Sequence, residues 1–177
     1  TIASIPHVSD HALYANFRRR SVTGAPGVTS RADLVAGDLR FLPALRLSVA
    51  SGRALEARDH EQHARVCVIG HSVADTLYRG DALGRWLTTD GLRCRVIGVL
   101  SPNDRFGFSI GFDWEKLIVI PATTGADWFA ELPRSSLILL VTDAVAANDP
   151  VKRILNARLV ERHHGIDDFS LIDFSTL

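Results

Sequence analysis

The sequence has no apolar run long enough to cross a membrane. A membrane-spanning helix needs roughly 18 or more consecutive apolar residues. The longest runs here, 117–122 and 137–141, have the length of a β-strand. The first residues also lack the basic, apolar and small-residue pattern of a secretory signal. Taken without relatives, the chain of 177 residues is therefore predicted to be a soluble globular protein.

An excess of one charge is also missing, since 20 basic residues balance 20 acidic ones. A nucleic-acid-binding protein usually carries a basic excess. The run Arg18–Arg20 is short enough to be the solvated end of a strand. No nucleic-acid partner is therefore expected. With 46% hydrophobic residues, the chain can bury a core as one domain or as two small lobes.

Motifs of catalysis and cofactor binding are missing as well. The loop Gly107–Gly111 lacks the G-x-x-x-x-G-K pattern of a phosphate-binding loop, and there is no G-x-S-x-G nucleophile elbow. His60 and His63 have weak ligand spacing without a complementary ligand set, and the adjacent His163 and His164 would point about 100° apart on a helix. We therefore assign no catalytic, cofactor-binding or metal-binding residue, and the chain is not expected to be an enzyme.

Only two cysteines are present, Cys67 and Cys94, and both fall in predicted strands. An oxidising compartment would permit a disulfide between them, which requires Cβ atoms about 4 Å apart. The alternative is a pair of buried thiols that behave as small apolar groups. The sequence leaves both possibilities open, because it does not show whether the two strands are neighbours.

Strand-like segments occur along most of the chain. Asp90-Gly91 between two such segments is a strong hairpin signal, because a type I′ turn needs a positive φ at both central residues. The segment from Val8 to Val22 alternates partly and predicts a half-exposed strand. The other expected strands are 31–36, 66–69, 86–89, 92–99, 115–120, 136–141 and 169–174.

Two helices have clear signals at their ends. His71 or Ser72 is expected to cap a helix over 73–79. Asn148 or Asp149 is expected to cap a longer helix over 150–164, which has proline in its first turn. The longer helix has an apolar stripe and lies between two expected strands, which predicts a βαβ unit with a parallel strand pair. The stripe contains Val151, Ile154, Leu155 and Leu159.

The order of several short motifs is the most specific signal in the chain. These motifs are Gly52-Arg53, Asp59, Val66–Gly70, Leu83-Gly84-Arg85, Arg95–Val99, Val119–Pro121 and His164–Phe169. In this order they resemble the extracytoplasmic, or periplasmic core, domain of ABC-transporter permeases of the MacB/FtsX-like type. Two motifs depart mildly from the family pattern. The usual Pro-Leu-Gly is Ala82-Leu83-Gly84 here, and the usual Arg-His-Gly is His163-His164-Gly165.

The resemblance implies an α+β fold with two lobes. A porter-like, membrane-proximal βαβ lobe would contain residues 1–47 and 134–177, and a sabre-like mixed α/β lobe, 48–133, would be inserted into it. Membrane helices would flank the domain outside this sequence, so it would be the extracytoplasmic part of an inner-membrane protein. The motif residues with an implied structural role are Gly52, Arg53, Asp59, Gly70, Leu83, Gly84, Gly98, Pro121, His164, Gly165, Asp168 and Phe169.

The resemblance also implies a function. A dimer of the permease would couple ATP hydrolysis by a cytoplasmic ABC ATPase to extracytoplasmic work, a mechanism called mechanotransmission. The first expectation for this work is efflux of a small molecule or peptide with a periplasmic adaptor and an outer-membrane channel. Two alternatives remain open. One is a related FtsX/LolCE-like permease that extracts lipoproteins or regulates cell-wall hydrolases, and the other is an independent binding module.

Overall fold

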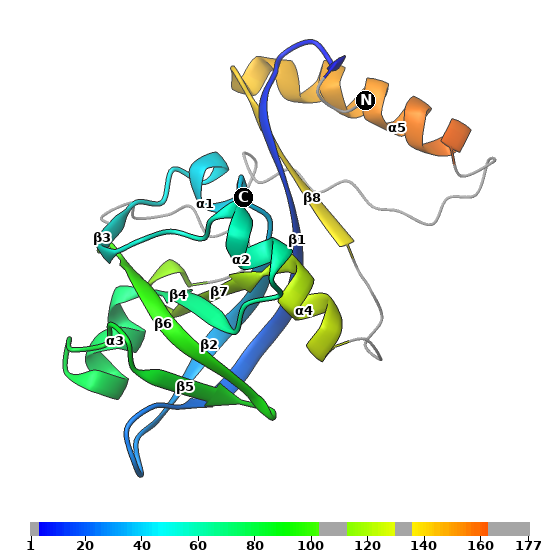
Figure 1. Ribbon diagram of the computed structural model, residues 1–177. Coiled ribbons are helices and arrows are strands. Elements are labelled where there is room, and N and C mark those ends of the chain that lie inside the picture. The colour runs from blue at the N-terminus through cyan, green and yellow to red at the C-terminus, as the bar shows by residue number, and fades with distance from the viewer. Residues whose placement is uncertain (1–3, 103–112, 130–135, 163–177) are drawn as a thin grey trace. The chain divides into compact units, whose positions relative to one another are not determined.

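The computed structural model describes residues 4–102, 113–129 and 136–162. The contacts of the chain separate it into two compact units (Figure 1). The smaller unit takes residues from both ends of the chain, Thr1–His11 and Leu140–Leu177, and the larger unit contains Ala12–Leu139. The long strand β1 (Val8–Thr23) begins in the smaller unit and continues into the larger one.

The larger unit is a mixed α/β structure in which short helices alternate with strands. A short 3₁₀ helix, Trp114–Lys116, leads directly into the strand that begins at Leu117. After β1, its elements are β2 (Thr29–Gly37), α1 (Phe41–Ala44), β3 (Val49–Gly52), α2 (Ala57–Glu61), β4 (Val66–Ile69), α3 (His71–Tyr78), β5 (Trp86–Thr89), β6 (Leu92–Leu100), β7 (Leu117–Pro121) and α4 (Ala122–Trp128).

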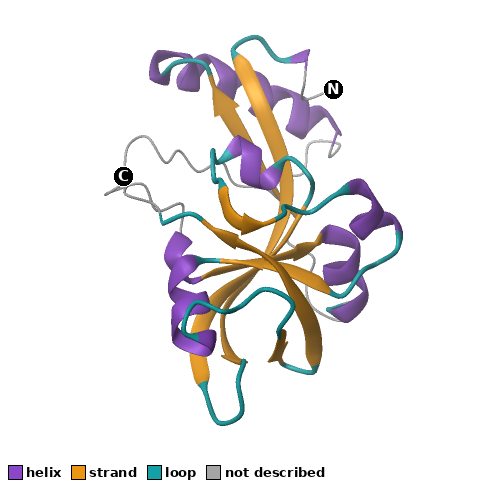
Figure 2. Ribbon diagram, turned by 60° about the vertical axis from the view of Figure 1, so that its left-hand side comes forward, coloured by secondary structure: helices purple, strands orange, loops and turns teal. Residues whose placement is uncertain are grey.

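The strands of the larger unit pair in a closed ring. β2 pairs with β7 in parallel, β7 with β4 antiparallel, β4 with β6 in parallel, and β6 with β5 antiparallel. β5 then meets β1 at Thr88 and Thr23, and the antiparallel pairing of β1 with β2 closes the ring. β3 pairs with β6 outside this path. Figure 2 shows the strands curving toward one another.

Alternate residues of these strands point into one apolar core. On β6, Cys94 and Val96 are buried in this core, whereas Arg93 and Arg95 beside them are exposed. Helix α3 adds its buried residues to the same core. β7 is buried at every position, which explains its uninterrupted apolar sequence, because a strand covered on both faces has no solvent-facing side.

The predicted strands are confirmed over most of the larger unit. The segment 66–69 coincides with β4, and the segments 8–22 and 31–36 lie within β1 and β2. The expected hairpin is also present, since β5 and β6 pair on either side of Asp90-Gly91. Both turn residues have positive φ, 44° at Asp90 and 81° at Gly91, as a type I′ turn requires.

In the larger unit, the starts of α3 and β7 differ from the sequence predictions. Neither His71 nor Ser72 caps α3, because both are already helical and Gly70, with φ −67° and ψ 157°, is the N-cap. Strand β7 begins at Leu117 rather than at residue 115, because residues 114–116 form the 3₁₀ helix. The side chain of Asp113 starts that helix by accepting a hydrogen bond from the backbone N–H of Glu115.

The sequence left open whether Cys67 and Cys94 form a disulfide or are buried thiols, and the structure decides between the two. Cys67 and Cys94 are both free thiols, and both are completely buried in the core of the larger unit. Burial raises the pKa of Cys67 well above its ordinary value, since a thiolate would lose its hydration there. In this structure the pair therefore acts as apolar packing.

The smaller unit joins the start of β1 to the end of β8 (Ser136–Thr142) and to α5 (Asn148–Arg162). The Ser9 hydroxyl donates to the carbonyl of Val141 at 3.1 Å, and Val151 and Leu155 of α5 pack with Ile5. Helix α5 begins at Asn148, two residues earlier than expected, because it continues from a 3₁₀ turn over Val145–Ala147. The expected strand 169–174 lies outside the described residues, so the βαβ unit stays a prediction.

Candidate functional site

The motif residues of β3 and β6 meet at a close crossing of two backbones. The backbone N–H of Arg53 donates to the carbonyl of Ile97 at 2.9 Å. A Cβ added to Gly98 would overlap the carbonyl of Arg53, and one added to Gly52 would overlap the carbonyl of Ile97. Gly52 also has a φ of 77°, which favours glycine. Both glycines therefore allow an approach that a side chain would prevent.

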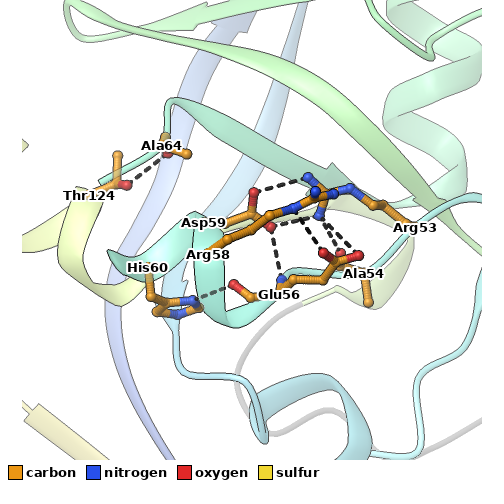
Figure 3. A network of polar contacts seen from close by, with 8 residues as sticks. All are labelled: Arg53, Ala54, Glu56, Arg58, Asp59, His60, Ala64 and Thr124. Carbon is orange, nitrogen blue, oxygen red and sulfur yellow. Dashed lines mark hydrogen bonds and ion pairs between the residues drawn. The ribbon is translucent and has the colours of Figure 1, made fainter. Parts of the chain in front are cut away.

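Arg53 continues from this crossing into a bidentate ion pair with Asp59 (Figure 3). The Nη1 atom of Arg53 lies 2.6 Å from Oδ2 of Asp59, and Nη2 lies 2.9 Å from Oδ1. Oδ2 also accepts the backbone N–H of Glu56 at 2.8 Å, at the start of α2. Asp59 is 4% exposed, so the structure holds a buried carboxylate that has three hydrogen-bond donors.

The electrostatics of the pair follow from this geometry. The hydrogen bonds from Arg53 hold the pKa of Asp59 below its ordinary value, and the N–H of Glu56 acts in the same direction, although burial opposes both. The same hydrogen bond raises the pKa of Arg53. The pair is therefore fully charged at neutral pH and fixes β3 to the first turn of α2.

Two threonines that no sequence motif indicated connect α2 and the segment after it to α4. The hydroxyl of Thr124, which is 1% exposed, donates to the carbonyl of Ala64 at 2.8 Å. The hydroxyl of Thr123 donates to the carbonyl of His60, also at 2.8 Å. Their acceptors lie about 60 residues earlier in the chain, so no local pattern could have indicated them.

The remaining described motif residues of the larger unit are Leu83, Gly84, Gly70 and Pro121. Leu83 packs so closely on Gly52 that a Cβ there would overlap its side chain, and the N–H of Gly84 donates to the carbonyl of Val96 at 2.8 Å. Gly70 donates its N–H to the carbonyl of Leu117 at 2.7 Å. Pro121 ends β7 before α4. The other motif residues, His164, Gly165, Asp168 and Phe169, lie outside the described residues.

The structure brings six of the motif residues together, and Gly70 and Pro121 stand apart from them. The six share the crossing of β3 and β6 and the adjoining ion pair: Gly52, Arg53, Asp59, Leu83, Gly84 and Gly98. We call this cluster the β3–β6 junction. Its structural role stays a prediction that substitutions can test.

The histidines weighed as metal ligands have other neighbours. Nε2 of His60 lies 3.0 Å from the carbonyl of Gly37, and Nδ1 of His63 lies 2.5 Å from a carboxylate oxygen of Asp127. Within the described ranges, no group of three or more His, Cys, Asp or Glu residues is placed to hold a metal ion. His163 and His164 are not among the described residues.

We expect Gly98→Ala to destabilise the larger unit by about 3 kcal/mol, because overpacking costs 1–3 kcal/mol or more when the obstacle is backbone. The new methyl group would overlap the carbonyl of Arg53. Ser51→Ala is the matched control, since Ser51 is exposed on the paired strand β3 and should change stability by less than about 0.5 kcal/mol. Chemical denaturation of both variants measures the difference. Equal stability of the two variants would mean that the close crossing is not required.

Comparison with known proteins identifies the family. Residues 1–157 match the family described as the MacB-like periplasmic core domain. The macrolide export ATP-binding/permease protein MacB of Wolinella succinogenes is 27% identical over 161 residues, which is 90% of this chain and 25% of that protein. The MacB of Rhodospirillum rubrum is 30% identical over 135 residues, which is 73% of this chain and 20% of that protein.

Two solved structures share the fold. The extracellular domain of the ABC-type transporter YknZ from Gram-positive bacteria superposes with a TM-score of 0.75, at 16% identity, over 97% of this chain and 85% of that one. The periplasmic region of MacB from Actinobacillus actinomycetemcomitans superposes with a TM-score of 0.70, at 18% identity, over 99% of this chain and 76% of that one.

The chain belongs to the family of MacB-like periplasmic core domains. It is the extracytoplasmic domain of a MacB-like ABC-transporter permease, which confirms the resemblance and the α+β fold class. It spans about a quarter of the length of the curated relatives that it matches. Within the described residues, no helix is both long enough and apolar enough to cross a membrane.

Proposed function

We propose that this domain transmits movement from the membrane part of a permease to extracytoplasmic partners. In this proposal the permease works as a dimer with a cytoplasmic ABC ATPase, fused or separate. Membrane helices on both sides of the domain carry the movement outward. The transported substrate is a small molecule or peptide, and an adaptor and an outer-membrane channel receive it.

The match of residues 1–157 to the family carries this proposal. The relatives that it matches are named macrolide export ATP-binding/permease proteins, which supports a macrolide-like substrate and an ATPase partner. The domain itself would not contact ATP. Its share of the work would be mechanical, which requires that its parts move as rigid bodies.

The β3–β6 junction supports rigidity within the larger unit. The charged pair of Arg53 and Asp59 joins β3 to α2, and the threonine hydroxyls join the end of α2 to α4. A displacement of β6 would therefore be transmitted through β3 to α2 and α4, two helices that lie far apart in the sequence. We retain the proposal that residues 1–47 and 134–177 form the porter-like lobe and residues 48–133 the sabre-like lobe.

A second candidate is a permease that works without an outer-membrane channel. The structural likeness to the extracellular domain of YknZ, a transporter of Gram-positive bacteria, favours this possibility. An FtsX/LolCE-like role in lipoprotein extraction or in the control of cell-wall hydrolases belongs to the same candidate.

The test uses the full-length permease with its ATPase in liposomes. We expect replacement of residues 12–139, the whole larger unit, by a short linker to leave ATP turnover within about threefold and to abolish export of a macrolide such as erythromycin. The unchanged permease is the control. Continued export without these residues would contradict the proposal, and ATP turnover with export of another substrate class would favour the second candidate.

We also expect the isolated 177-residue chain to show no ATP turnover. It has no phosphate-binding loop of the G-x-x-x-x-G-K type to hold the nucleotide. Release of phosphate from ATP by the purified chain measures this, with a variant of the β3–β6 junction prepared in parallel to detect contaminating ATPases. Turnover that follows the protein through purification would overturn the mechanical role.

A further inference from the structure

The outer face of the β5–β6 hairpin carries positive charge around an exposed tryptophan. Trp86 and Thr88 of β5 and Arg93 and Arg95 of β6 are all exposed, and the residues between them face the core. Trp86 is the direct cross-strand partner of Arg95, and Thr88 is the partner of Arg93. We call these four residues the basic face.

Carboxylates do not neutralise this face. Among the residues that the structure describes, neither Arg93 nor Arg95 has an acidic partner within ion-pair distance, and the same holds for the exposed Arg79 nearby in the chain. The turn residue Asp90 is paired with Arg20 instead, at 3.0 Å. The chain as a whole is neutral, so this unpaired positive charge is a local feature.

Trp86 is held in place although it is exposed. The guanidinium of Arg93 lies 4.5 Å from the centre of its indole ring, a cation–π contact. The side chain remains 45% exposed. Tryptophan and arginine are the residue types most enriched among those that dominate binding energy at protein interfaces. A fixed, exposed tryptophan between arginines therefore has the composition of a binding site.

A cleft of about 480 Å³ adjoins the basic face. Its walls come from the turn after β1, from the end of α3 and from the start of β5, so that it shares Trp86 with the basic face. Its lining includes Pro26, Leu77, Tyr78, Arg79, Trp86 and the ion pair of Arg85 with Asp81. The cleft thus offers apolar surface beside Arg79, the lining arginine without an acidic partner in the described part of the chain, with room for one apolar side chain of a partner.

We propose that the basic face and its cleft bind an acidic segment of a partner protein that also presents an apolar side chain. The carboxylates of the segment would pair with Arg93 and Arg95, and its apolar side chain would enter the cleft beside Trp86. This site is independent of the proposed export function, because it depends only on the surface of the larger unit.

The chemistry of the face favours a protein partner over a membrane surface. Its cations are arginines, whose planar guanidinium groups match carboxylates in a bidentate geometry. Trp86 contacts Arg93 through the cation–π interaction and also lines the cleft, so it is placed to contact a side chain that enters the cleft. A carboxylate-rich peptide is therefore the ligand that complements both the charge and the shape.

The experiment uses the 177-residue chain and a synthetic peptide with three glutamates on each side of one phenylalanine. Amide chemical shifts locate the peptide, and titration calorimetry measures its affinity at two salt concentrations. The variants are Arg93→Glu with Arg95→Glu, and the milder Arg93→Gln with Arg95→Gln. The matched control is Arg31→Glu with Arg46→Glu, which changes the net charge equally at exposed positions elsewhere.

We expect shifts confined to residues 76–95 and the turn 24–28, and affinity that falls at least tenfold in the Glu variant and at least threefold in the Gln variant. The control should bind within twofold of the unchanged chain, and a peptide with serine in place of phenylalanine should bind more weakly. No binding, equal weakening in the control, or shifts elsewhere would overturn the proposal. If the peptide does not bind, two further results would also overturn the proposal. One is binding of the chain to phosphatidylglycerol vesicles that depends on Arg93 and Arg95. The other is self-association of the chain that depends on the same two arginines.

Discussion

Replacing Arg53 by alanine should destabilise the larger unit by about 3 kcal/mol at neutral pH. The change removes one partner of an ion pair whose other partner, Asp59, is buried, and breaking such a pair costs about 3–5 kcal/mol. Arg53 itself keeps about a third of its side chain exposed, which favours the lower part of that range. The loss is a large share of the 5–15 kcal/mol that stabilise a typical domain.

Arg85→Ala is the matched control for this change. Arg85 also pairs with an aspartate at 2.6 Å, but both Arg85 and Asp81 are mostly exposed, at 59% and 76%. An exposed pair contributes about 0–1 kcal/mol because water and salt screen it. Denaturant unfolding of both variants should therefore separate two ion pairs of equal length that differ in burial. Equal losses for Arg53→Ala and Arg85→Ala would contradict the importance of the buried pair.

The pH dependence gives an independent test of the same pair. Because the folded structure lowers the pKa of Asp59, the pair contributes its full stability above the unfolded carboxylate pKa of about 4. The contribution is lost as the pH falls through the lower folded pKa. The difference in unfolding free energy between the unchanged chain and Arg53→Ala should therefore narrow below about pH 4. A difference that stays constant from pH 7 to pH 3 would assign the loss to packing alone.

Replacing Leu155 by alanine should release α5 from the smaller unit. Leu155 is 8% exposed and packs with Ile5 and Val151 in a small core. Truncating a buried leucine costs about 2–5 kcal/mol. We expect hydrogen exchange of the α5 amides to accelerate strongly, with little change in β4 and β7, which belong to the other unit.

Asn156→Ala is the control on the same helix. Asn156 follows Leu155 directly and is exposed, so its replacement should change stability by no more than about 0.5 kcal/mol. Similar exchange in the two variants would mean that α5 is not docked through its apolar stripe. In the full-length permease, Leu155→Ala should reduce transport and leave ATP binding intact, if this unit carries movement from the membrane.

Features that depend on neighbouring residues could be predicted from the sequence. The Asp90-Gly91 turn is one, because the conformations that its two residues tolerate are local properties. The alternation of buried and exposed residues on β6 is another, since successive side chains of a strand face opposite sides. The motif order also indicated the family, and it marked Arg53 and Asp59 as important without indicating their contact.

Helix boundaries were harder to predict because they depend on distant groups. Gly70 caps α3 where its N–H reaches the carbonyl of Leu117, a residue far along the chain. The hydrogen bonds of Thr123 and Thr124 have the same character. In each case the polar group could form a hydrogen bond with a residue close to it in the sequence. In the folded structure it bonds instead to a residue far away in the chain.

The sequence by itself determined the local elements of this protein, its family and the absence of a net charge. Only the tertiary structure decided that β1 and β2 close a ring of strands, that the two cysteines are buried as free thiols, and that Arg93 and Arg95 lie beside an exposed tryptophan. The physical reason is that local conformation follows from adjacent side chains. Pairing between distant strands instead depends on whether the apolar area that it buries outweighs the entropy of closing the intervening loops.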